Sequence, residues 1–406
     1  MNCHVENFLK IIKYAIHESK DDTLPELIQF VDWARMSNMA KAHNLFALFH
    51  EVAYKYPSYQ SCAEYERNTQ TALTIIAQQL KKTESFLQLY REFLDNNLHP
   101  IVMKGIVCRQ LYGKYGEHRP SGDEDILVKK DEFYKVKTVM EAHGYVCEQP
   151  DVTKLQLDTL QEVSFYESRS RFLIEVHTNI MGNENEMRTQ MGECFRDVFE
   201  HMHVFEICDL PIATMSHTEH LLFLVLHAFK HFTLTGVGLR QMLDILLFQE
   251  RYEEEIDWKY VEESLKKNHA IEYFGDLQFI GMQYLGFDLH VRFQTRDPES
   301  LLEDMIEVGV FGKKEEADVL AARINLSTNE TKGRGIFILM RAGFPSISYM
   351  RNSAPYLDEK PWLLPFEWIK RWVRFVKRSK AYNGNLMLVG LQKSKKRKEL
   401  LKKYGI

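Results

Sequence analysis

The spacing of hydrophobic and polar positions changes twice along the chain. Up to residue 98, apolar residues recur three and four positions apart, as at Phe8, Ile11 and Ile12, which predicts amphipathic helices. The next hundred or so residues alternate short strand-like apolar runs with helical patches, which predicts an α+β block. From residue 213 the spacing is helical again. We therefore expect four regions: 1–98, 99–212, 213–330 and 331–406.

Individual elements follow from the same pattern. The predicted strands are 101–103, 126–128, 162–166, 172–177 and 204–207. The predicted helices are 132–143, 239–252, 257–267, 269–284, 298–308, 315–324 and 366–380, with a loop at 328–335. Ser216 and Glu219 form a capping-box signature, which predicts that a helix begins after Ser216.

Composition narrows the class of protein. A hydrophobic fraction of 45% and a charged fraction of 27% are typical of a globular chain and exclude a disordered chain, a collagen and a disulfide scaffold. The six cysteines are scattered without a Cys-x-x-Cys pair, which is typical of reduced cytoplasmic thiols. The longest apolar run, 221–226, is far shorter than the ~20 residues of a membrane span. We expect a cytoplasmic protein without a membrane partner.

The net charge of -5 conceals two oppositely charged parts. Residues 370–406 hold thirteen Lys and Arg and one acid, a charge of +12, and the rest of the chain carries -17. Residues 393–403 lack the interleaved aromatic residues of a stacking platform, so a solvated tail is favoured and nucleic acid is the weaker alternative. An apolar stripe before the tail is expected to pack on the body rather than on a membrane: Ile369, Trp372, Val373 and Val376.

Two aspartates at the start of a predicted strand are the strongest sign of chemistry. In the sequence Gly-Asp-Glu-Asp-Ile-Leu-Val, Asp123 and Asp125 fall on one face of the strand, because side chains alternate across a strand. Their positions are about 6–7 Å apart along the strand. Two such carboxylates suit Mg²⁺, which prefers carboxylate oxygens and substrate phosphates. A single Asp-x-Asp is more often a pair of solvated turn acids, so a metal site requires further ligands nearby.

A second strand with polar residues supplies candidates for those ligands. In Phe-Leu-Ile-Glu-Val-His, Glu175 and His177 alternate with apolar residues. If this strand pairs beside the first, Glu175 and His177 join Asp123 and Asp125 on one face, where His177 is a candidate for substrate contact. Three carboxylates around one or two metal ions are an arrangement for phosphoryl or nucleotidyl transfer. An acid at the third position can also take the proton of the acceptor.

Several motifs together resemble a known family. They are Lys104–Gly105, Arg119–Val128, His143–Tyr145, Glu175–His177, Leu224–His231 and Tyr356–Arg371. The set resembles the uncharacterised bacterial nucleotidyltransferase family, within the polymerase-β-like nucleotidyltransferase superfamily, over most of the chain. The resemblance implies a polymerase-β-like nucleotidyltransferase core at 99–212, flanked by N- and C-terminal helical regions.

The resemblance also implies roles for the acids and the glycine. Asp123 and Asp125 would bind Mg²⁺ with Glu175 as the third acid, and Gly105 would be the phosphate-loop glycine. The residues expected to grip phosphate beside it are Lys104, Arg119, Ser121 and Gly122. An alternative for Lys104 is a buried ion pair with Asp125.

The sequence departs from the family pattern in three places. Lys104 and Ile106 flank the glycine, so the usual small hydroxyl residue is missing. Seventeen residues separate Gly105 from Asp123, more than the superfamily usually has. Glu124 replaces the apolar residue between the aspartates, which predicts that its face of the strand is less buried.

The helical region after residue 213 adds further candidates. His227 and His231 lie four positions apart on one helical face with His220. Zinc binding, core packing and substrate contact are all open for them, and zinc is the weakest because no His-Glu-x-x-His pattern accompanies them. Arg240 is a further candidate for substrate contact, although its spacing to Asp244 is more typical of a surface ion pair.

The sequence thus predicts a Mg²⁺-dependent nucleotidyltransferase, with room for two metal ions. It would transfer a nucleoside monophosphate from an NTP to an acceptor and release pyrophosphate. A small molecule, a protein side chain and an RNA end all stay open as acceptors. The alternative is a non-catalytic nucleotide- or partner-binding protein on the same fold.

Overall fold

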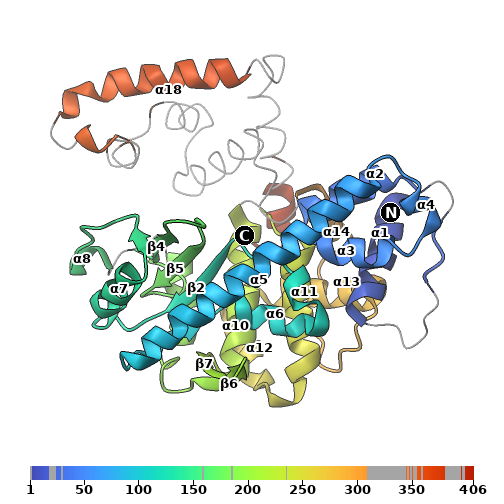
Figure 1. The fold of residues 1–406 in the computed structure, drawn as a ribbon, viewed down its shortest axis with the longest axis horizontal. Helices are drawn as coiled ribbons and strands as arrows, with labels where there is room; N and C mark the ends of the chain where they lie inside the picture. The colour runs from blue at the N-terminus through green and yellow to red at the C-terminus, as the bar shows by residue number, and fades with distance from the viewer. Residues whose placement is uncertain are drawn as a thin grey trace. The chain divides into compact units, whose positions relative to one another are not determined.

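The computed structural model (Figure 1) describes residues 2–17, 24–28, 31–157, 160–183, 186–234 and 236–308, and towards the C-terminus residues 344, 347, 350, 354–357, 360–379, 395 and 398–406. The chain divides into two compact units. The first comprises 1–230 and 238–310, and the second comprises 231–237 and 311–406. The boundaries expected at residues 98 and 212 therefore fall inside the first unit.

The N-terminal part is helical, as expected. Its helices are α1 (Cys3–His17), α2 (Trp33–Ala42), α3 (Phe46–Ala53), α4 (Pro57–Gln60) and the long α5 (Tyr65–Asp95) that crosses the first unit in Figure 1. Asp32 caps α2, because its carboxylate accepts the N–H of Arg35 at 2.9 Å. Tyr90 of α5 donates its hydroxyl to the carbonyl of Pro100 and accepts the N–H of Ala213, so α5 is bonded to the chain on either side of the sheet region.

The core holds a five-stranded mixed sheet in the order β1-β2-β5-β4-β3. The strands are β1 (Ile101–Val102), β2 (Asp123–Leu127), β3 (Tyr145–Cys147), β4 (Glu162–Glu167) and β5 (Leu173–His177). The pair β2–β5 is parallel and the other three pairs are antiparallel. With its flanking helices this is the α+β architecture that the sequence predicts. The helical elements between the strands are α6 (Ile106–Arg109), the 3₁₀ segment η1 (Gln110–His118), α7 (Phe133–Ala142) and α8 (Lys154–Leu157).

The two faces of this sheet differ in polarity. One face carries Ile126, Ile174, Val176 and other apolar residues that are completely buried. Helix α7 packs on this face, with the ring of Phe133 6.4 Å from that of Phe165. The opposite face carries Asp123, Asp125 and Glu175, because the side chains alternate along each strand, whereas Glu124 shares the apolar face. Burial of one face therefore fixes which side chains face the candidate site.

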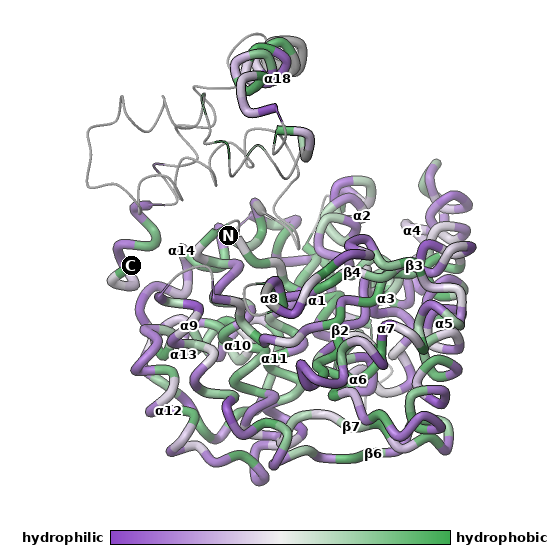
Figure 2. The backbone as a smooth tube through the Cα atoms, turned by 90° about the vertical axis from the view of Figure 1, so that its left-hand side faces the viewer, coloured by the Kyte–Doolittle hydropathy of each residue, from purple (hydrophilic) through white to green (hydrophobic). Residues whose placement is uncertain are grey.

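After the sheet the chain forms a two-stranded hairpin and a set of helices. These elements are α9 (Glu186–Gly192), η2 (Glu193–Phe195), β6 (His203–Ile207), β7 (Leu210–Thr214), α10 (His217–Leu234), α11 (Leu239–Tyr252), η3 (Glu253–Glu255), α12 (Trp258–Lys267), α13 (Ile271–Ile280), the π-helical η4 (Gly281–Leu285) and α14 (Pro298–Val308). Ser216 accepts the N–H of Glu219, which confirms the predicted start of α10. Figure 2 shows the hydrophobic stretches of α10 and α11 in the middle of the first unit.

The second unit contains η5 (Pro355–Leu357), η6 (Pro361–Leu363) and α18 (Leu364–Ser379). Helix α18 corresponds to the predicted helix 366–380, whereas the helix expected at 315–324 and the loop at 328–335 lie outside the described residues. Ile369, Trp372 and Val373 are exposed, so the expected packing of their stripe stays a prediction. None of the described helices is both long and apolar enough to cross a membrane.

Candidate active site

The register of the two parallel strands brings the predicted acids together. Asp125 of β2 is paired with Glu175 of β5, and Leu127 is paired with His177. Residues paired in this way project on the same face, so the acids and the imidazole share the polar face of the sheet. The two strands therefore pair, which is the condition on which the predicted common face depends, and the predicted position of Asp123 at the start of β2 is confirmed.

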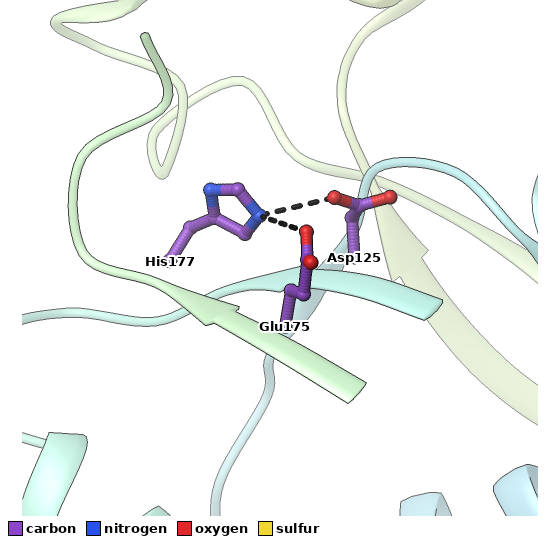
Figure 3. Close-up of side chains that lie close together, drawn as sticks. All are labelled: Asp125, Glu175 and His177. Carbon is purple, nitrogen blue, oxygen red and sulfur yellow. Dashed lines mark hydrogen bonds and ion pairs between the residues drawn. The ribbon is translucent and has the colours of Figure 1, made fainter. Parts of the chain in front are cut away.

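Asp125, Glu175 and His177 converge on one point (Figure 3). The Nε2 of His177 lies 3.1 Å from Oδ1 of Asp125 and 4.0 Å from Oε2 of Glu175. Glu162 of β4 adds a further carboxylate oxygen 3.8 Å from the same nitrogen. The side chains of Asp125 and His177 are only 4% and 3% exposed, so water does not screen these interactions fully.

Crowded carboxylates have shifted protonation equilibria here. Burial and the charges of Asp125, Glu162 and Asp123 raise the pKa of Glu175 to about 9. Burial and the charge of Asp125 also raise the pKa of Asp123. Burial acts in the same direction on Asp125, but Lys104 and His177 outweigh it and hold its pKa below the usual range. Asp125 is therefore the ionised acid of the group, and Glu175 holds a proton at neutral pH.

Two lysines face this cluster. The Nζ of Lys104 lies 3.6 Å from Oδ2 of Asp125, which confirms the ion pair considered from the sequence. The same ammonium donates to Nε2 of His227 at 3.1 Å, so that ring carries its proton on Nδ1. Lys230 is 4% exposed, bonds to Gln161 at 3.3 Å and contributes to the lowered pKa of Asp125. The site thus combines ionised and protonated acids with two ammonium groups.

The expectation that the face of Glu124 is less buried is wrong. Glu124 is completely buried, and its carboxylate accepts from Arg109 at 2.7 Å and from the N–H of Ile106 at 2.6 Å. Gly105 has a φ of +65°, and a Cβ at this position would overlap the Glu124 carboxylate. The lack of a side chain at Gly105 therefore serves the approach of Glu124, because only glycine satisfies both conditions.

Arg119 and its neighbours are held by internal contacts. Arg119 is 3% exposed and binds Asp244 of α11 through two hydrogen bonds of 2.7 and 2.6 Å. Ser121 accepts from Arg109 at 2.8 Å, whereas Gly122 is exposed with open space around it. The phosphate contacts expected of these three residues stay predictions.

Arg240 is also buried, and it donates to the carbonyl of Pro120 at 2.6 Å. The interpretation of Arg240 and Asp244 as a surface ion pair is therefore wrong, because both are buried and Asp244 is bound by Arg119. His220 is a core residue that bonds the carbonyl of Met103 at 2.8 Å. His231 belongs to the second unit, and its predicted substrate contact stays a prediction.

The long spacer between Gly105 and Asp123 is folded against three other elements. Its η1 segment places the hydroxyl of Tyr112 2.9 Å from Asp244 of α11 and Glu117 3.1 Å from Thr83 of α5. His118 at the end of η1 lies 3.3 Å from Glu51 of α3. The additional residues therefore connect β2 to the surrounding helices.

Comparison with known proteins places this chain. Residues 29–272, more than half of its length, match the model of the uncharacterised nucleotidyltransferase family. The chain belongs to that family. Neither the curated proteins nor the solved structures gave a match. Family membership implies nucleotidyl transfer in general terms, with an NTP as substrate.

The donor atoms of this family member fit a divalent metal ion. Among the described residues, one ligand atom each of Asp125, Glu175 and His177 lie within 4.8 Å of one another. Oδ2 of Asp125 is buried and accepts no hydrogen bond from the part of the chain that the structure describes. Lys104 lies 3.6 Å from this oxygen, beyond hydrogen-bond distance, so a bound cation would satisfy it more fully. Asp123 is not in this group, although the charge of Asp125 contributes to its raised pKa.

Residues of α5 that support the candidate site were missed in the sequence. Lys82 of α5 donates to the carbonyl of Ser121 at 2.8 Å, and Gln79 accepts the N–H of Ser121 at 2.9 Å, so α5 holds the chain just before β2. No local pattern marks these two residues, since they lie about forty positions before the strand. His177, a candidate for substrate contact in the sequence, also lies close enough to Asp125 and Glu175 to be a candidate metal ligand.

Proposed function

We propose that this chain transfers a nucleoside monophosphate from an NTP to an acceptor hydroxyl or similar group, with a divalent metal ion and release of pyrophosphate. In this reaction the acceptor oxygen forms a bond to the α-phosphorus, and the bond from that phosphorus to the pyrophosphate oxygen breaks. The observation that carries the proposal is the pairing of Asp125 with Glu175 across parallel strands, in a chain of the nucleotidyltransferase family.

Asp123, Asp125 and Glu175 would hold the metal, with Mg²⁺ as the expected ion and space for two. When bound, such an ion neutralises phosphate charge at the reacting centre. The register supports this assignment because it places Asp125 and Glu175 side by side on the polar face. The raised pKa of Glu175 beside the lowered pKa of Asp125 also supports this assignment. Neighbouring acids whose pKa values are shifted in opposite directions are typical of functional sites.

The acceptor must lose a proton when its oxygen bonds to phosphorus. Once an ion offsets the charges around it, Glu175 is ionised and is available to take that proton. Glu162 is a second candidate, because its carboxylate lies on the same face and is more exposed, at 37%. In both cases the proton ends on a carboxylate of the polar face.

The phosphates need cations and small residues nearby. Lys104 is suited to this role, because its side chain is 21% exposed and its ammonium lies against Asp125. Gly122 leaves open space next to Asp123, which allows a phosphate to approach the backbone. Arg119 and Ser121 are already engaged in internal hydrogen bonds, so the proposal does not assign them a phosphate.

Transfer of label from NTPs labelled at the α-phosphate tests the proposal. Wild-type protein with Mg²⁺ or Mn²⁺ and a broad acceptor pool should transfer label and release pyrophosphate. Asp125→Asn should reduce transfer at least about 100-fold, because it removes a charge that the ion requires. Asp95→Asn is the matched control, since Asp95 is exposed at the end of α5. Equal activity in both variants would exclude the assigned site.

One observation favours the second candidate, a non-catalytic nucleotide-binding protein. The carboxylate of Glu124 takes the N–H of Ile106, at the helix start where the family is expected to bind triphosphate. If the protein binds nucleotide without catalysis, NTP binding would depend on the metal ion and on Asp125, but no label would be transferred to any acceptor. The same experiment therefore separates the two candidates.

A further inference from the structure

The imidazole of His177 occupies an unusual position among the acids. Its Nε2 faces Oδ1 of Asp125 at 3.1 Å, Oε2 of Glu162 at 3.8 Å and Oε2 of Glu175 at 4.0 Å. Figure 3 shows the ring of His177 directed at Asp125 and Glu175 from the end of β5. Three carboxylate oxygens thus surround one nitrogen that is buried at the base of the site.

A hydrogen bond accounts for only one of these approaches. A ring nitrogen carries at most one proton, so it can donate to Asp125 but not to all three oxygens at once. A shared cation accounts for more of them, because it attracts the nitrogen lone pair and the carboxylates together. Neighbouring ligands of an octahedral ion with bonds of about 2.1 Å lie about 3.0 Å apart, which matches the nitrogen–Asp125 separation.

The burial of the carboxylate oxygens of Asp125 and Glu175 is consistent with a cation bound between them. Oδ2 of Asp125 has no hydrogen-bond donor among the residues that the structure describes. The side chain of Asp125 is 4% exposed and that of Glu175 is 19% exposed. Both carboxylates can be ionised together at this distance only if a further positive charge lies between them, in addition to that of Lys104, whose Nζ lies 3.6 Å from Oδ2 of Asp125.

We propose that His177 is a direct ligand of the ion held by Asp125 and Glu175, and that this position prefers a first-row transition-metal dication such as Mn²⁺ to Mg²⁺. The chemical reason is the donor set. Mg²⁺ strongly prefers oxygen ligands, whereas an imidazole nitrogen suits transition metals. The inference rests on the proposed function, since it concerns the metal of that same site.

Mn²⁺ alone, added to the full-length protein and followed by electron paramagnetic resonance, tests the inference. Pulsed measurements should show coupling of Mn²⁺ to a nitrogen-14 nucleus in the wild type. His177→Gln should lose that coupling and weaken Mn²⁺ binding by about tenfold or more. Mg²⁺, measured by competition with Mn²⁺, should lose less affinity, so the preference for Mn²⁺ falls.

His99→Gln is the matched control, because His99 is exposed and lies outside the cluster. It should keep both the nitrogen coupling and the affinity. Thermal unfolding of each variant shows whether the fold is retained, and the conservative His177→Asn provides a second variant if His177→Gln unfolds. Loss of coupling in both folded variants supports direct ligation.

Three results would overturn the inference. They are Mn²⁺ bound to the wild type without nitrogen coupling, coupling that persists in both His177 variants, and equal losses of Mn²⁺ and Mg²⁺ affinity. None of these three results argues against the proposed function if Asp125→Asn still abolishes metal binding. Conversely, nitrogen-coupled Mn²⁺ in a protein that transfers no label would leave this inference standing and remove only the catalytic proposal.

Discussion

Glu175 has a charge that depends on the occupant of the site. Its pKa of about 9 arises from burial and from three neighbouring carboxylates. At pH 7 the metal-free protein therefore holds a proton on Glu175. A divalent ion must displace that proton, because a carboxylate binds metal in its ionised form.

We predict that binding of Mg²⁺ or Mn²⁺ releases close to one proton at pH 7. Affinity should rise with pH up to about 9 and then level off, since Glu175 is ionised above its pKa. Calorimetry in buffers of different ionisation enthalpy measures the released protons directly. In Glu175→Gln the release should disappear and binding should weaken. Proton release that persists in this variant would contradict the assignment.

Two buried histidines predict the stability of the protein in acid. His43 and His220 both have pKa values of about 4, chiefly because burial disfavours the charged ring. In the unfolded chain each takes up a proton near pH 6.5, so the unfolded state binds more protons between pH 6.5 and 4. Their contribution to stability is full above pH 6.5 and is lost as the pH falls to 4, by up to about 3 kcal/mol each.

Denaturant unfolding at pH 7.5 and pH 5 checks this expectation. His220→Gln should be less stable at pH 7.5 but should lose less stability on acidification than the wild type. His99→Gln should retain the full acid sensitivity, because His99 is exposed. An unchanged slope in His220→Gln would show that this ring is not the group that titrates.

At the scale of single residues, the sequence predicted positions better than partners. The spacing of Asp123 and Asp125, with one residue between them, was sufficient to place both acids on one face of the strand. The burial of Glu124 was not predictable, because its partner Arg109 precedes it by fifteen positions and comes from a helix across the sheet face. The local sequence around Glu124 does not indicate that the buried guanidinium of Arg109 is its partner.

At the scale of elements, the turn from β1 into α6 has a strict steric requirement. Gly105 combines a φ of +65° with the close approach of the Glu124 carboxylate. Gly144, after α7, has a φ of +82°, but a methyl group added there would meet nothing within 4 Å. The two glycines therefore share a positive φ and differ in the space around them.

We predict that Gly144→Ala lowers the free energy of unfolding by about 1 kcal/mol, which is the cost of the left-handed conformation alone. Gly105→Ala should cost about 3 kcal/mol, because the methyl group also displaces Glu124 from Ile106 and Arg109. Denaturant unfolding of both variants measures the difference. Equal losses would mean that Glu124 moves aside without cost.

The faces on which the side chains of β2 and β5 lie could be predicted from the sequence. The alternation in each strand indicated that Glu175 and His177 join Asp125 on one face if the strands pair, and the structure shows that they do. The start of α10 was equally accessible, because the hydroxyl of Ser216 is a local cap. The cap depends on residues three positions apart, whereas the pairing of Asp125 with His177 joins positions 52 residues apart, so only its face could be predicted locally.

At the scale of the whole molecule, contacts between distant segments connect the site to the helical part of the first unit. Arg119 lies just before β2 and binds Asp244 of α11, 125 positions later. Nothing in either local sequence indicates this pairing. The sequence instead suggested a surface pair of Arg240 and Asp244, because spacing along one helix is visible and contact between helices is not.

We predict that Asp244→Ala costs about 3–5 kcal/mol of stability, because it leaves the guanidinium of Arg119 buried without a counter-charge. The double variant Arg119→Met with Asp244→Leu should lose less, since no charge is left unpaired. Glu262→Ala, which breaks the exposed pair with Lys266, is the control and should cost under about 1 kcal/mol. A double variant less stable than Asp244→Ala would contradict this explanation.

The most direct test of the central claim is calorimetric titration of NTPs into the metal-free protein, with and without Mg²⁺ or Mn²⁺. It does not require the acceptor to be known. We predict binding that requires the divalent ion in the wild type and in Asp95→Asn, and that is lost in Asp125→Asn. NTP binding of equal strength without the ion, or undiminished in Asp125→Asn, would show that the paired acids of β2 and β5 are not a metal-dependent nucleotide site.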